Sequence, residues 1–221
     1  MAVRVIITGA TGMVGEGVLH ECLLHAEVEK VLIINRKASG FEHTKLEELV
    51  HADFYDLSPV ENRLAGYNAC FFCLGVSSIG MNEDMYHRIT YDLTLNFAHT
   101  VLKLNPELVF CFVSGSGTDS TGKGRSMWAR VKGNTENALL ALGFNGAYMF
   151  RPGFMHPTPG LTNTLKYYRY INWMYPAVRK IFPAYVSTLK ELGLAMIHSV
   201  TGGYGKSVLE VKDIVALAKR S

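Results

Sequence analysis

The sequence predicts an α/β fold in which a doubly wound parallel sheet carries helices on both faces, followed by a small C-terminal lobe. Short apolar runs alternate with helical patterns along residues 3–150. The runs are apolar throughout and do not alternate with polar residues, which is typical of strands covered on both faces. This alternation stops after Gly153, where the composition changes.

The individual elements follow from local patterns and from the residues that end them. The expected strands are 3–8, 31–35, a run near 50–54, 70–74, 108–113 and 147–150. The expected helices are 14–24, 59–64, 84–104 and 126–142. Asn105-Pro106 ends the third helix and Gly143 ends the fourth, while residues 114–124 are rich in glycine and serine and predict a loop.

The length of 221 residues suits a single domain, 1–221. Residues 154–206 are rich in Tyr, Pro and basic side chains, and we expect them to form helices and loops of a small lobe over the substrate. The formal net charge of +3 is too small to indicate a nucleic-acid partner. No apolar run is long enough to span a membrane, so contact with a membrane would be peripheral.

The start of the chain and the cysteines indicate a cytoplasmic protein. Residues 1–4 lead directly into a strand and lack the pattern of a signal peptide. Cys70 and Cys73 lie three apart in an expected strand, so their side chains would point to opposite faces and could not pair there. We expect the four cysteines to be buried thiols in a reducing compartment.

The strongest motif is T-G-A-T-G-M-V-G at residues 8–15, between the first strand and the first helix. Gly9 permits the tight turn, Gly12 lets a pyrophosphate approach the backbone, and Gly15 lets the helix pack on the strand. The free N–H groups of the helix N-terminus favour phosphate. The motif predicts a dinucleotide site of Rossmann type whose turn contacts are Gly9, Thr11, Gly12, Met13 and Val14.

The end of the second expected strand favours NADP over NAD. Enzymes that use NAD usually carry an acid there for the ribose 2′-OH, whereas this chain has Arg36, which suits a 2′-phosphate. NAD remains an alternative, because basic surface residues are common and Arg36 could belong to an exposed basic turn. We also expect cofactor contacts from residues that follow the third and fourth strands: Asp53, Phe54, Leu74 and Gly75.

Four motifs together resemble a known family. These are the glycine turn, F-C-L-G at 72–75, V-K-G at 131–133 and R-P-G at 151–153. They are similar to atypical short-chain dehydrogenases, and most of all to the Tat-interacting-protein-like oxidoreductases. The resemblance covers residues 3 to about 155 and the C-terminal segment 208–218, which is similar to that branch's last strand and helix. It implies that Pro152 and Gly153 also contact the cofactor.

The resemblance also implies a catalytic Ser and a Tyr-x-x-x-Lys pair, since residues i and i+4 share one helix face. Lys132 is present, but Trp128 stands where the Tyr is expected. An indole N–H donates a hydrogen bond and does not titrate usefully. Ser114 and Ser116 are both available for the Ser role, and we prefer Ser116. A tyrosine of the lobe is an alternative proton donor, with no choice among Tyr167, Tyr168, Tyr170, Tyr175 and Tyr185.

Other patterns are weaker. Residues 117–124, G-T-D-S-T-G-K-G, nearly match a phosphate loop, but Gly124 replaces the hydroxyl that would hold Mg²⁺, so we expect a flexible loop beside the nicotinamide. His20 and His25 lie five apart and diverge around a helix, and no metal site is expected. The aromatic and basic stretch 166–180 fits a substrate lid, with a membrane interface or a partner protein as alternatives.

The sequence therefore predicts an NADP(H)-binding protein of the short-chain dehydrogenase type. The first hypothesis is an oxidoreductase or epimerase-like enzyme that acts on a small carbonyl or hydroxyl substrate, with Ser116 and Lys132 as catalytic residues. The second is a non-catalytic NADP(H)-binding regulator or scaffold, which Trp128 motivates.

Overall fold

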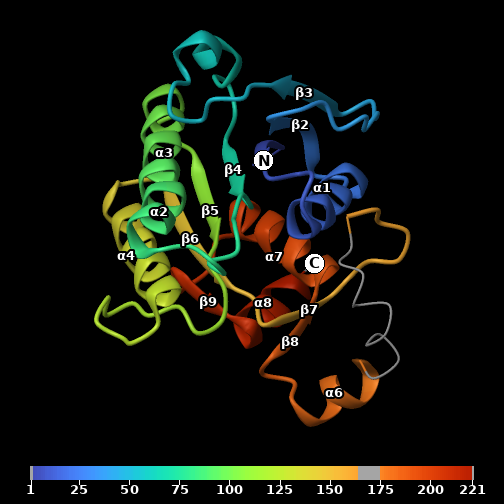
Figure 1. Cartoon of the computed structure of the whole chain (residues 1–221). Coiled ribbons are helices and arrows are strands. Elements are labelled where there is room, and N and C mark those ends of the chain that lie inside the picture. Colours follow the sequence, from blue (N-terminus) through green and yellow to red (C-terminus); the bar gives the residue numbers. More distant parts are fainter. Residues whose placement is uncertain (1, 164–174, 221) are drawn as a thin grey trace.

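The computed structural model describes residues 2–163 and 175–220, and its centre is a seven-stranded sheet in the order β3-β2-β1-β4-β5-β6-β9 (Figure 1). Every neighbouring pair in this sheet is parallel. The strand order reverses between β1 and β4, so the carboxyl ends of these two strands open a crevice. The strands are β1 (Val3–Thr8), β2 (Val28–Asn35), β3 (Leu46–Val50), β4 (Ala69–Phe72), β5 (Val109–Val113), β6 (Gly146–Arg151) and β9 (Val208–Glu210).

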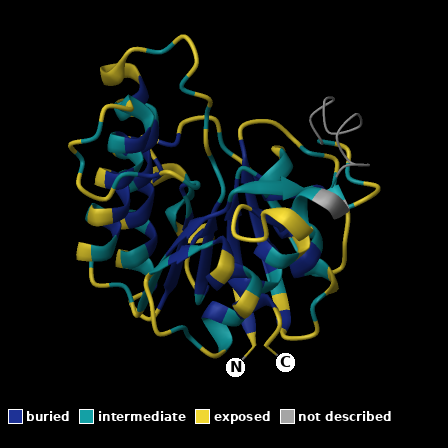
Figure 2. Ribbon diagram, turned by 90° about the horizontal axis from the view of Figure 1, so that it is seen from below, coloured by how far each residue is buried: buried dark blue, intermediate teal, exposed yellow. Residues whose placement is uncertain are grey.

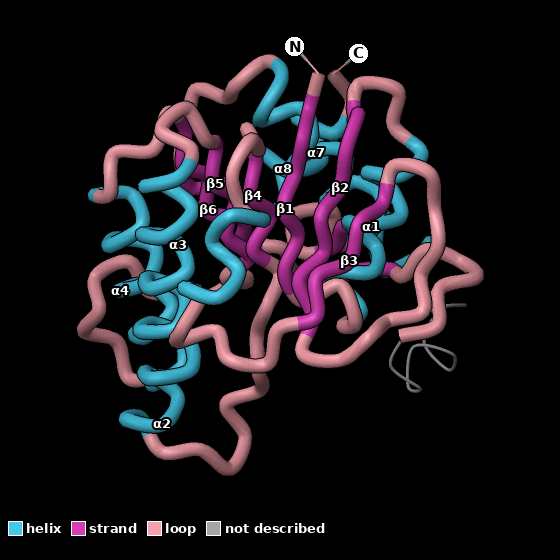
Figure 3. The backbone as a smooth tube through the Cα atoms, turned by 90° about the horizontal axis from the view of Figure 1, so that it is seen from above, coloured by secondary structure: helices cyan, strands magenta, loops and turns pink. Residues whose placement is uncertain are grey.

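Helices cover both faces of the sheet, which confirms the predicted doubly wound class (Figure 3). One face is covered by α1 (Met13–Leu24), α7 (Leu189–Thr201) and α8 (Val211–Ala218). The other is covered by the short 3-10 helix η1 (Ser58–Arg63), by α3 (Leu93–Leu104) and by α4 (Met127–Ala141). A helix α2 (Glu83–His87) and a π-helical turn η2 (Arg88–Asp92) lead directly into α3.

Strand β1 explains why the apolar runs show no alternation. Val5 and Ile7 pack into the core beneath α1 and α7, whereas Ile6 packs into the core on the opposite face. All three side chains are fully buried. Buried residues make up much of the central sheet in Figure 2. Each such side chain contributes about 1.5–3 kcal/mol relative to an exposed one, so both faces of the strand must be apolar.

The predicted third strand was misplaced. Strand β3 covers Leu46–Val50, so the expected run near 50–54 shares only Val50 with it, and residues 51–54 form a loop at the carboxyl end of the sheet. The misassignment has a physical cause. Strand β3 is an edge strand that pairs only with β2, so it is half exposed and carries Glu47 and Glu48. The long helix expected over 84–104 is present, but η2 interrupts its α-helical pattern.

The C-terminal lobe is smaller than expected. It contains β7 (Phe154–His156), which pairs with β8 (Val186–Thr188), and α6 (Tyr175–Ile181). Helix α7, which was assigned to the lobe, packs against α1 in the main body. The contact is close, because a Cβ on Gly17 would lie 2.8 Å from Leu189 and a Cβ on Gly193 would lie 2.8 Å from Glu21.

Candidate functional site

The glycine turn has the geometry that its spacing predicts. Gly9 has a positive φ of 71°, and a Cβ on it would lie 2.8 Å from the backbone at the end of β4. A Cβ on Gly15 would lie 2.1 Å from the Gly9 oxygen, so this glycine permits α1 to pack on the turn. A Cβ on Gly12 would meet nothing closer than 3.5 Å. The open side of the turn is therefore at Gly12, where a phosphate would approach.

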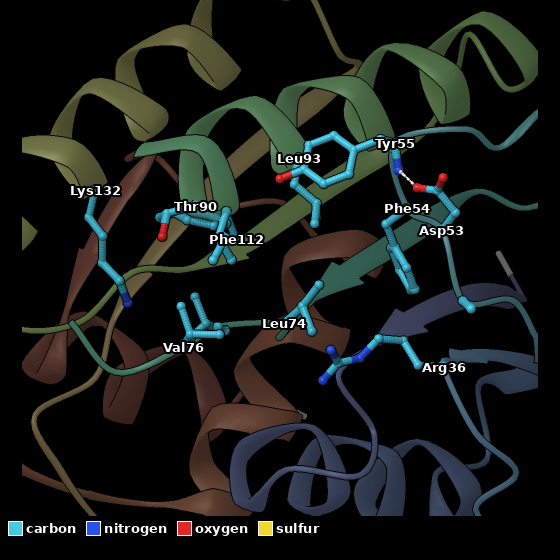
Figure 4. A pocket seen from close by; sticks show the side chains of 14 residues that line it. Arg36, Asp53, Phe54, Tyr55, Leu74, Val76, Thr90, Leu93, Phe112 and Lys132 are labelled. Carbon is cyan, nitrogen blue, oxygen red and sulfur yellow. Dashed lines mark hydrogen bonds between the residues drawn. The ribbon is translucent and has the colours of Figure 1, made fainter. Parts of the chain in front are cut away.

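A cavity of about 250 Å³ lies at the carboxyl ends of the central strands (Figure 4). The Leu74 N–H donates to the Thr8 hydroxyl (3.3 Å) and so ties the ends of β4 and β1 together beside it. Lys132 lies at one end of the cavity and Arg36 at the other, with Leu74 and Val76 between them. Six of the residues predicted from the sequence line it: Arg36, Asp53, Phe54, Leu74, Gly75 and Lys132.

The other predicted cofactor contacts do not line the cavity. Thr11, Met13 and Val14 belong to the glycine turn and the first turn of α1. Pro152 and Gly153 follow β6, and a Cβ on Gly153 would lie 2.2 Å from the Tyr185 oxygen. Close packing between the lobe and the chain that follows β6 is therefore enough to explain a glycine at position 153.

The Arg36 end is shaped by a carboxylate on the neighbouring strand. The side-chain amide of Asn35 donates to Glu48 Oε1 (2.8 Å), and the Ser39 N–H donates to the same atom (2.9 Å). Burial raises the pKa of Glu48, but these hydrogen bonds lower it further, so the net shift is downward. Arg36 itself is exposed and forms no ion pair with any residue in 2–163 or 175–220. Its guanidinium is thus available to an anion.

Lys132 approaches the cavity from α4. Its ammonium donates to the backbone oxygen of Ser114, directly after β5. Burial lowers the pKa of Lys132 to about 8, and the charge of Glu136 opposes that shift. An ammonium that titrates near this pH can both hold a hydroxyl as a donor and exchange a proton.

The two candidate serines differ in what their hydroxyls do. The Ser114 hydroxyl is buried, and it lies 2.5 Å from Glu136 Oε1 and 3.1 Å from the Phe150 oxygen. Ser116 is half-buried, and its N–H donates to the Pro152 oxygen (3.0 Å). Its hydroxyl makes no hydrogen bond within the part of the chain that the structure describes. The Ser114 hydroxyl is therefore engaged within the protein, whereas the Ser116 hydroxyl has no such partner among the described residues.

A buried ion pair lies beneath Ser114, and sequence reasoning missed it. Arg151 Nε donates to Glu136 Oε1 (3.0 Å), and a second bond joins Arg151 Nη2 to Glu136 Oε2. Arg151 also reaches Glu210 Oε1 at 3.2 Å. Because the pair joins α4 to β6 and β9, it holds the helix that carries Lys132 against the sheet.

Trp128 lies outside the cavity. Its ring packs over Gly117, whose added Cβ would lie 3.4 Å from it. Trp128 therefore contributes no side chain to the cavity that Lys132 lines. Of the lobe tyrosines, Tyr175 packs against His156 and donates toward no cavity residue, and Tyr185 is exposed. Tyr167, Tyr168 and Tyr170 lie outside the described residues.

The loop at 117–124, which we expected to be flexible, contains hydrogen bonds to a carboxylate of its own. Asp119 fills its centre and accepts from the Thr121 N–H (3.0 Å), the Thr121 hydroxyl (2.7 Å) and the Gly124 N–H (2.6 Å). Arg130 donates to the Gly124 oxygen (2.7 Å) and fixes the loop on α4. The amides that a phosphate loop would offer to an anion are therefore already used by a carboxylate of the chain.

Several cavity residues could not be predicted. Helix α3 and the turn η2 place side chains over the cavity from a segment whose pattern indicated only a helix. π-helical turns are frequent at functional sites, but nothing in the sequence marks this one. The missed lining residues are Ala52, Tyr55, Val76, Ile89, Thr90, Leu93, Phe112 and Val113.

Residues 5–127 match the NAD dependent epimerase/dehydratase family. The chain belongs to this family. It is thereby an NAD(P)-binding protein of the atypical short-chain dehydrogenase type, oxidoreductase-like or epimerase-like, as the glycine turn and the sheet order indicated. The enzyme WbmF of Bordetella bronchiseptica, described in complex with NAD⁺, has the same fold, with a TM-score of 0.66 and 13% identity over 98% of this chain and 76% of that one.

Two relatives support the predicted branch. Protein FMP52-2, mitochondrial, of Scheffersomyces stipitis is 30% identical over 159 residues, 70% of this chain and 67% of that protein. Protein HTATIP2 of Rattus norvegicus is 28% identical over 153 residues, 68% of this chain and 62% of that protein. The comparison thus spans only about two thirds of each relative's length. The resemblance to Tat-interacting-protein-like oxidoreductases is confirmed.

The predicted cytoplasmic location was wrong. It rested on the lack of a signal-peptide pattern and on the expected buried thiols, yet the FMP52-2 relative is named a mitochondrial protein. Within residues 2–163 and 175–220, no helix has both the length and the apolar content needed to cross a bilayer. Most of the aromatic and basic stretch 166–180, namely 166–174, lies outside the described residues.

Proposed function

We propose that the chain binds NADP(H), with the adenosine 2′-phosphate on Arg36 and the nicotinamide ribose on Lys132. The observation that carries this is the pair of cations at opposite ends of one cavity. The strand end beside Arg36 carries Asn35 in place of an acid, and Asn35 is engaged with Glu48. A 2′-phosphate is thus met by a guanidinium and by no carboxylate at the end of β2.

The cavity and the turn also fit the rest of a dinucleotide. Gly12 leaves room for a pyrophosphate at the N-terminus of α1, whose first turn offers free N–H groups. Phe54 and Leu93 supply apolar wall for a base at the Arg36 end, and Asp53 lies beside them. The full set of proposed contacts is Gly9, Thr11, Gly12, Met13, Val14, Arg36, Asp53, Phe54, Leu74, Gly75, Lys132, Pro152 and Gly153.

The proposed reaction is reduction of a small carbonyl compound or its reverse. Bound NADPH would supply the hydride to the carbonyl carbon, and the carbonyl oxygen would take its proton from the Lys132 ammonium, which solvent would reprotonate. Ser116 would orient that oxygen through its unengaged hydroxyl, and Lys132 would hold the ribose. Position 128 carries no Tyr. Among the described residues that line this end of the cavity, Lys132 is therefore the side chain that can titrate.

The cofactor proposal is tested by titrating NADPH and NADH into the purified protein. NADPH should bind more tightly, and Arg36→Ala should weaken it about ten- to hundredfold, since a charge-assisted phosphate contact contributes about 1.5–3 kcal/mol. Lys37→Ala is the matched control, because Lys37 is the next basic residue and does not line the cavity. Equal affinity for NADH, or an Arg36→Ala variant that binds NADPH normally, would contradict the 2′-phosphate contact.

A second candidate function is a non-catalytic NADP(H)-binding regulator. The packing of Trp128 over Gly117 favours it, because the usual proton donor is replaced by a structural side chain. Incubation with NADPH and a panel of carbonyls and quinones separates the two candidates. Cofactor oxidation that is lost in Lys132→Ala supports the enzyme, whereas tight binding without turnover supports the regulator. Activity gained in Trp128→Tyr would identify the missing donor.

A further inference from the structure

A ridge of exposed apolar side chains projects from the lobe. Residues 180–185 (K-I-F-P-A-Y), here called the lobe ridge, are exposed without interruption. Ile181, Phe182 and Tyr185 expose 66%, 54% and 64% of their surface. Helix α6, which begins this ridge, lies at the edge of the molecule in Figure 1, and Figure 2 views the molecule from that side. Three large apolar side chains within five residues need an explanation, whereas single ones do not.

Shallow hollows lie on either side of the lobe ridge. One, of about 320 Å³, is almost wholly apolar and is formed by α6 with β7 and β8; it includes Val178, Phe182 and Tyr185. The other, of about 400 Å³, lies between the ridge and α8 and includes Pro183 and Ala184. The apolar surface is therefore continuous from α6 across the ridge to α8.

Unpaired lysines flank this surface. Lys180 begins the ridge, while Lys212 and Lys219 border the second hollow from α8. Among the described residues none of these three lysines forms an ion pair, whereas Arg179 and Lys206 nearby are matched by Glu191 and Asp213. The charge that remains on this side of the molecule is positive, so a partner of negative charge is favoured.

We infer that the lobe ridge docks on an anionic lipid surface. Aromatic and aliphatic side chains that protrude on a ridge can enter the headgroup and acyl boundary of a bilayer, where Phe and Tyr are well accommodated. Lysines beside the ridge would reach lipid phosphates while their stems lie along the apolar surface. A protruding ridge with cations on both sides suits a soft, insertable surface better than the flat contact of a rigid protein.

The expected binding is reversible and depends on charge. One short apolar ridge gives weak attachment by itself, so the lysines must contribute. Each lysine near an anionic surface contributes enough to change partitioning about fivefold, and salt screens that contribution. Neutral vesicles should therefore bind little protein, and high ionic strength should release the protein from anionic ones.

The test is co-flotation of the purified protein with vesicles of phosphatidylcholine alone or of phosphatidylcholine and phosphatidylserine in equal parts. We expect flotation only with the mixed vesicles. Phe182→Glu combined with Tyr185→Glu should abolish it, and Lys212→Glu combined with Lys219→Glu should reduce it about tenfold or more. The matched controls are Leu24→Glu, an apolar residue that is 68% exposed at the end of α1, and Lys103→Glu on α3; both should float normally.

Three outcomes would overturn the inference: no flotation with mixed vesicles, equal flotation of the ridge variant and the wild type, or a change of oligomeric state in the ridge variant without lipid. The last outcome would assign the ridge to contact between copies of the chain. Far-UV circular dichroism and NADPH binding check that each variant is folded, so a failed fold is not mistaken for lost docking.

Discussion

Glu16 on α1 holds Thr162, although 146 residues separate them in the sequence. The carboxylate accepts from the Thr162 N–H (2.8 Å) and from its hydroxyl (2.8 Å), and the other oxygen accepts from the Asn163 N–H (2.7 Å). Glu16 is buried and immediately follows Gly15 of the glycine turn. The chain that leaves β7 is thus fastened beside the turn at which we propose that the pyrophosphate binds.

Removing this carboxylate should weaken the fold. Glu16→Ala leaves three donors without their acceptor, so we expect a loss of about 2–3 kcal/mol in the free energy of unfolding, measured with urea. Burial raises the pKa of Glu16, and the bonds from Thr162 and Asn163 lower it by more. The contribution is therefore complete above the usual Glu pKa and is lost as pH falls through the lowered folded-state value. Glu107→Ala, an exposed control, should change neither stability nor its pH dependence.

Burial of the Lys132 ammonium should lower the free energy of unfolding, while the same side chain should strengthen NADPH binding. Its folded-state pKa of about 8 lies below the 10.5 of an exposed lysine, so the unfolded chain binds the proton more tightly. Stability should therefore rise with pH between about 8 and 10.5. Lys132→Met should raise the free energy of unfolding at pH 7 by about 1–3 kcal/mol while it weakens NADPH binding. If Lys132→Met is less stable than Lys37→Met across this pH range, the burial penalty is not present.

The ion pair between Arg151 and Glu136 should behave as a unit. Arg151→Met leaves Glu136 buried without its cation, and we expect a loss of about 3–5 kcal/mol in urea unfolding. Adding Glu136→Gln should restore a large part of that loss, because the uncompensated charge is removed. Losses that simply add in the double variant would show that the two side chains contribute independently.

Gly133 supports the loop around Asp119. A Cβ on Gly133 would lie 1.8 Å from the Asp119 backbone oxygen, so Gly133→Ala must displace the loop from α4. We expect faster amide hydrogen exchange and earlier proteolysis within residues 115–124. Gly205→Ala, whose added Cβ would meet nothing within 4 Å, is the control. Unchanged exchange in Gly133→Ala would mean that the loop is held mainly by Arg130.

Local patterns were sufficient for the buried part of the fold. Strand β1 and the helices α1 and α4 were predicted to within a residue, because their apolar runs, glycines and the preceding Ser126 are local signals. Strand β3 was missed because an edge strand is only half covered and its Leu-Glu-Glu-Leu pattern is weak. Helix α7 was misassigned because packing on Gly17 is a tertiary contact that no local pattern reports.

The candidate site also contains some residues that the sequence predicted and others that it could not predict. Arg36, Leu74 and Lys132 follow strands or lie in a motif, so their place in the cavity was predictable. Thr90 and Leu93 line it from a π-helical turn and the helix that follows, and that placement depends on the whole fold. The sequence does not distinguish Ser114 from Ser116. The difference lies in the fold, which places Glu136 beside the Ser114 hydroxyl.

Gly15 and Gly12 differ in what would preserve them over evolutionary time. Gly15 is demanded by the protein itself, since any side chain there collides with the Gly9 oxygen at 2.1 Å. Gly12 has room for a methyl group among the described residues, with its nearest neighbour at 3.5 Å, so the proposed phosphate is what would exclude one. In a descendant that lost dinucleotide binding, we expect Gly15 to be retained and Gly12 to be replaced by other residues. A set of relatives sorted by residue 12 would therefore separate the lineages that still bind from those that only kept the architecture.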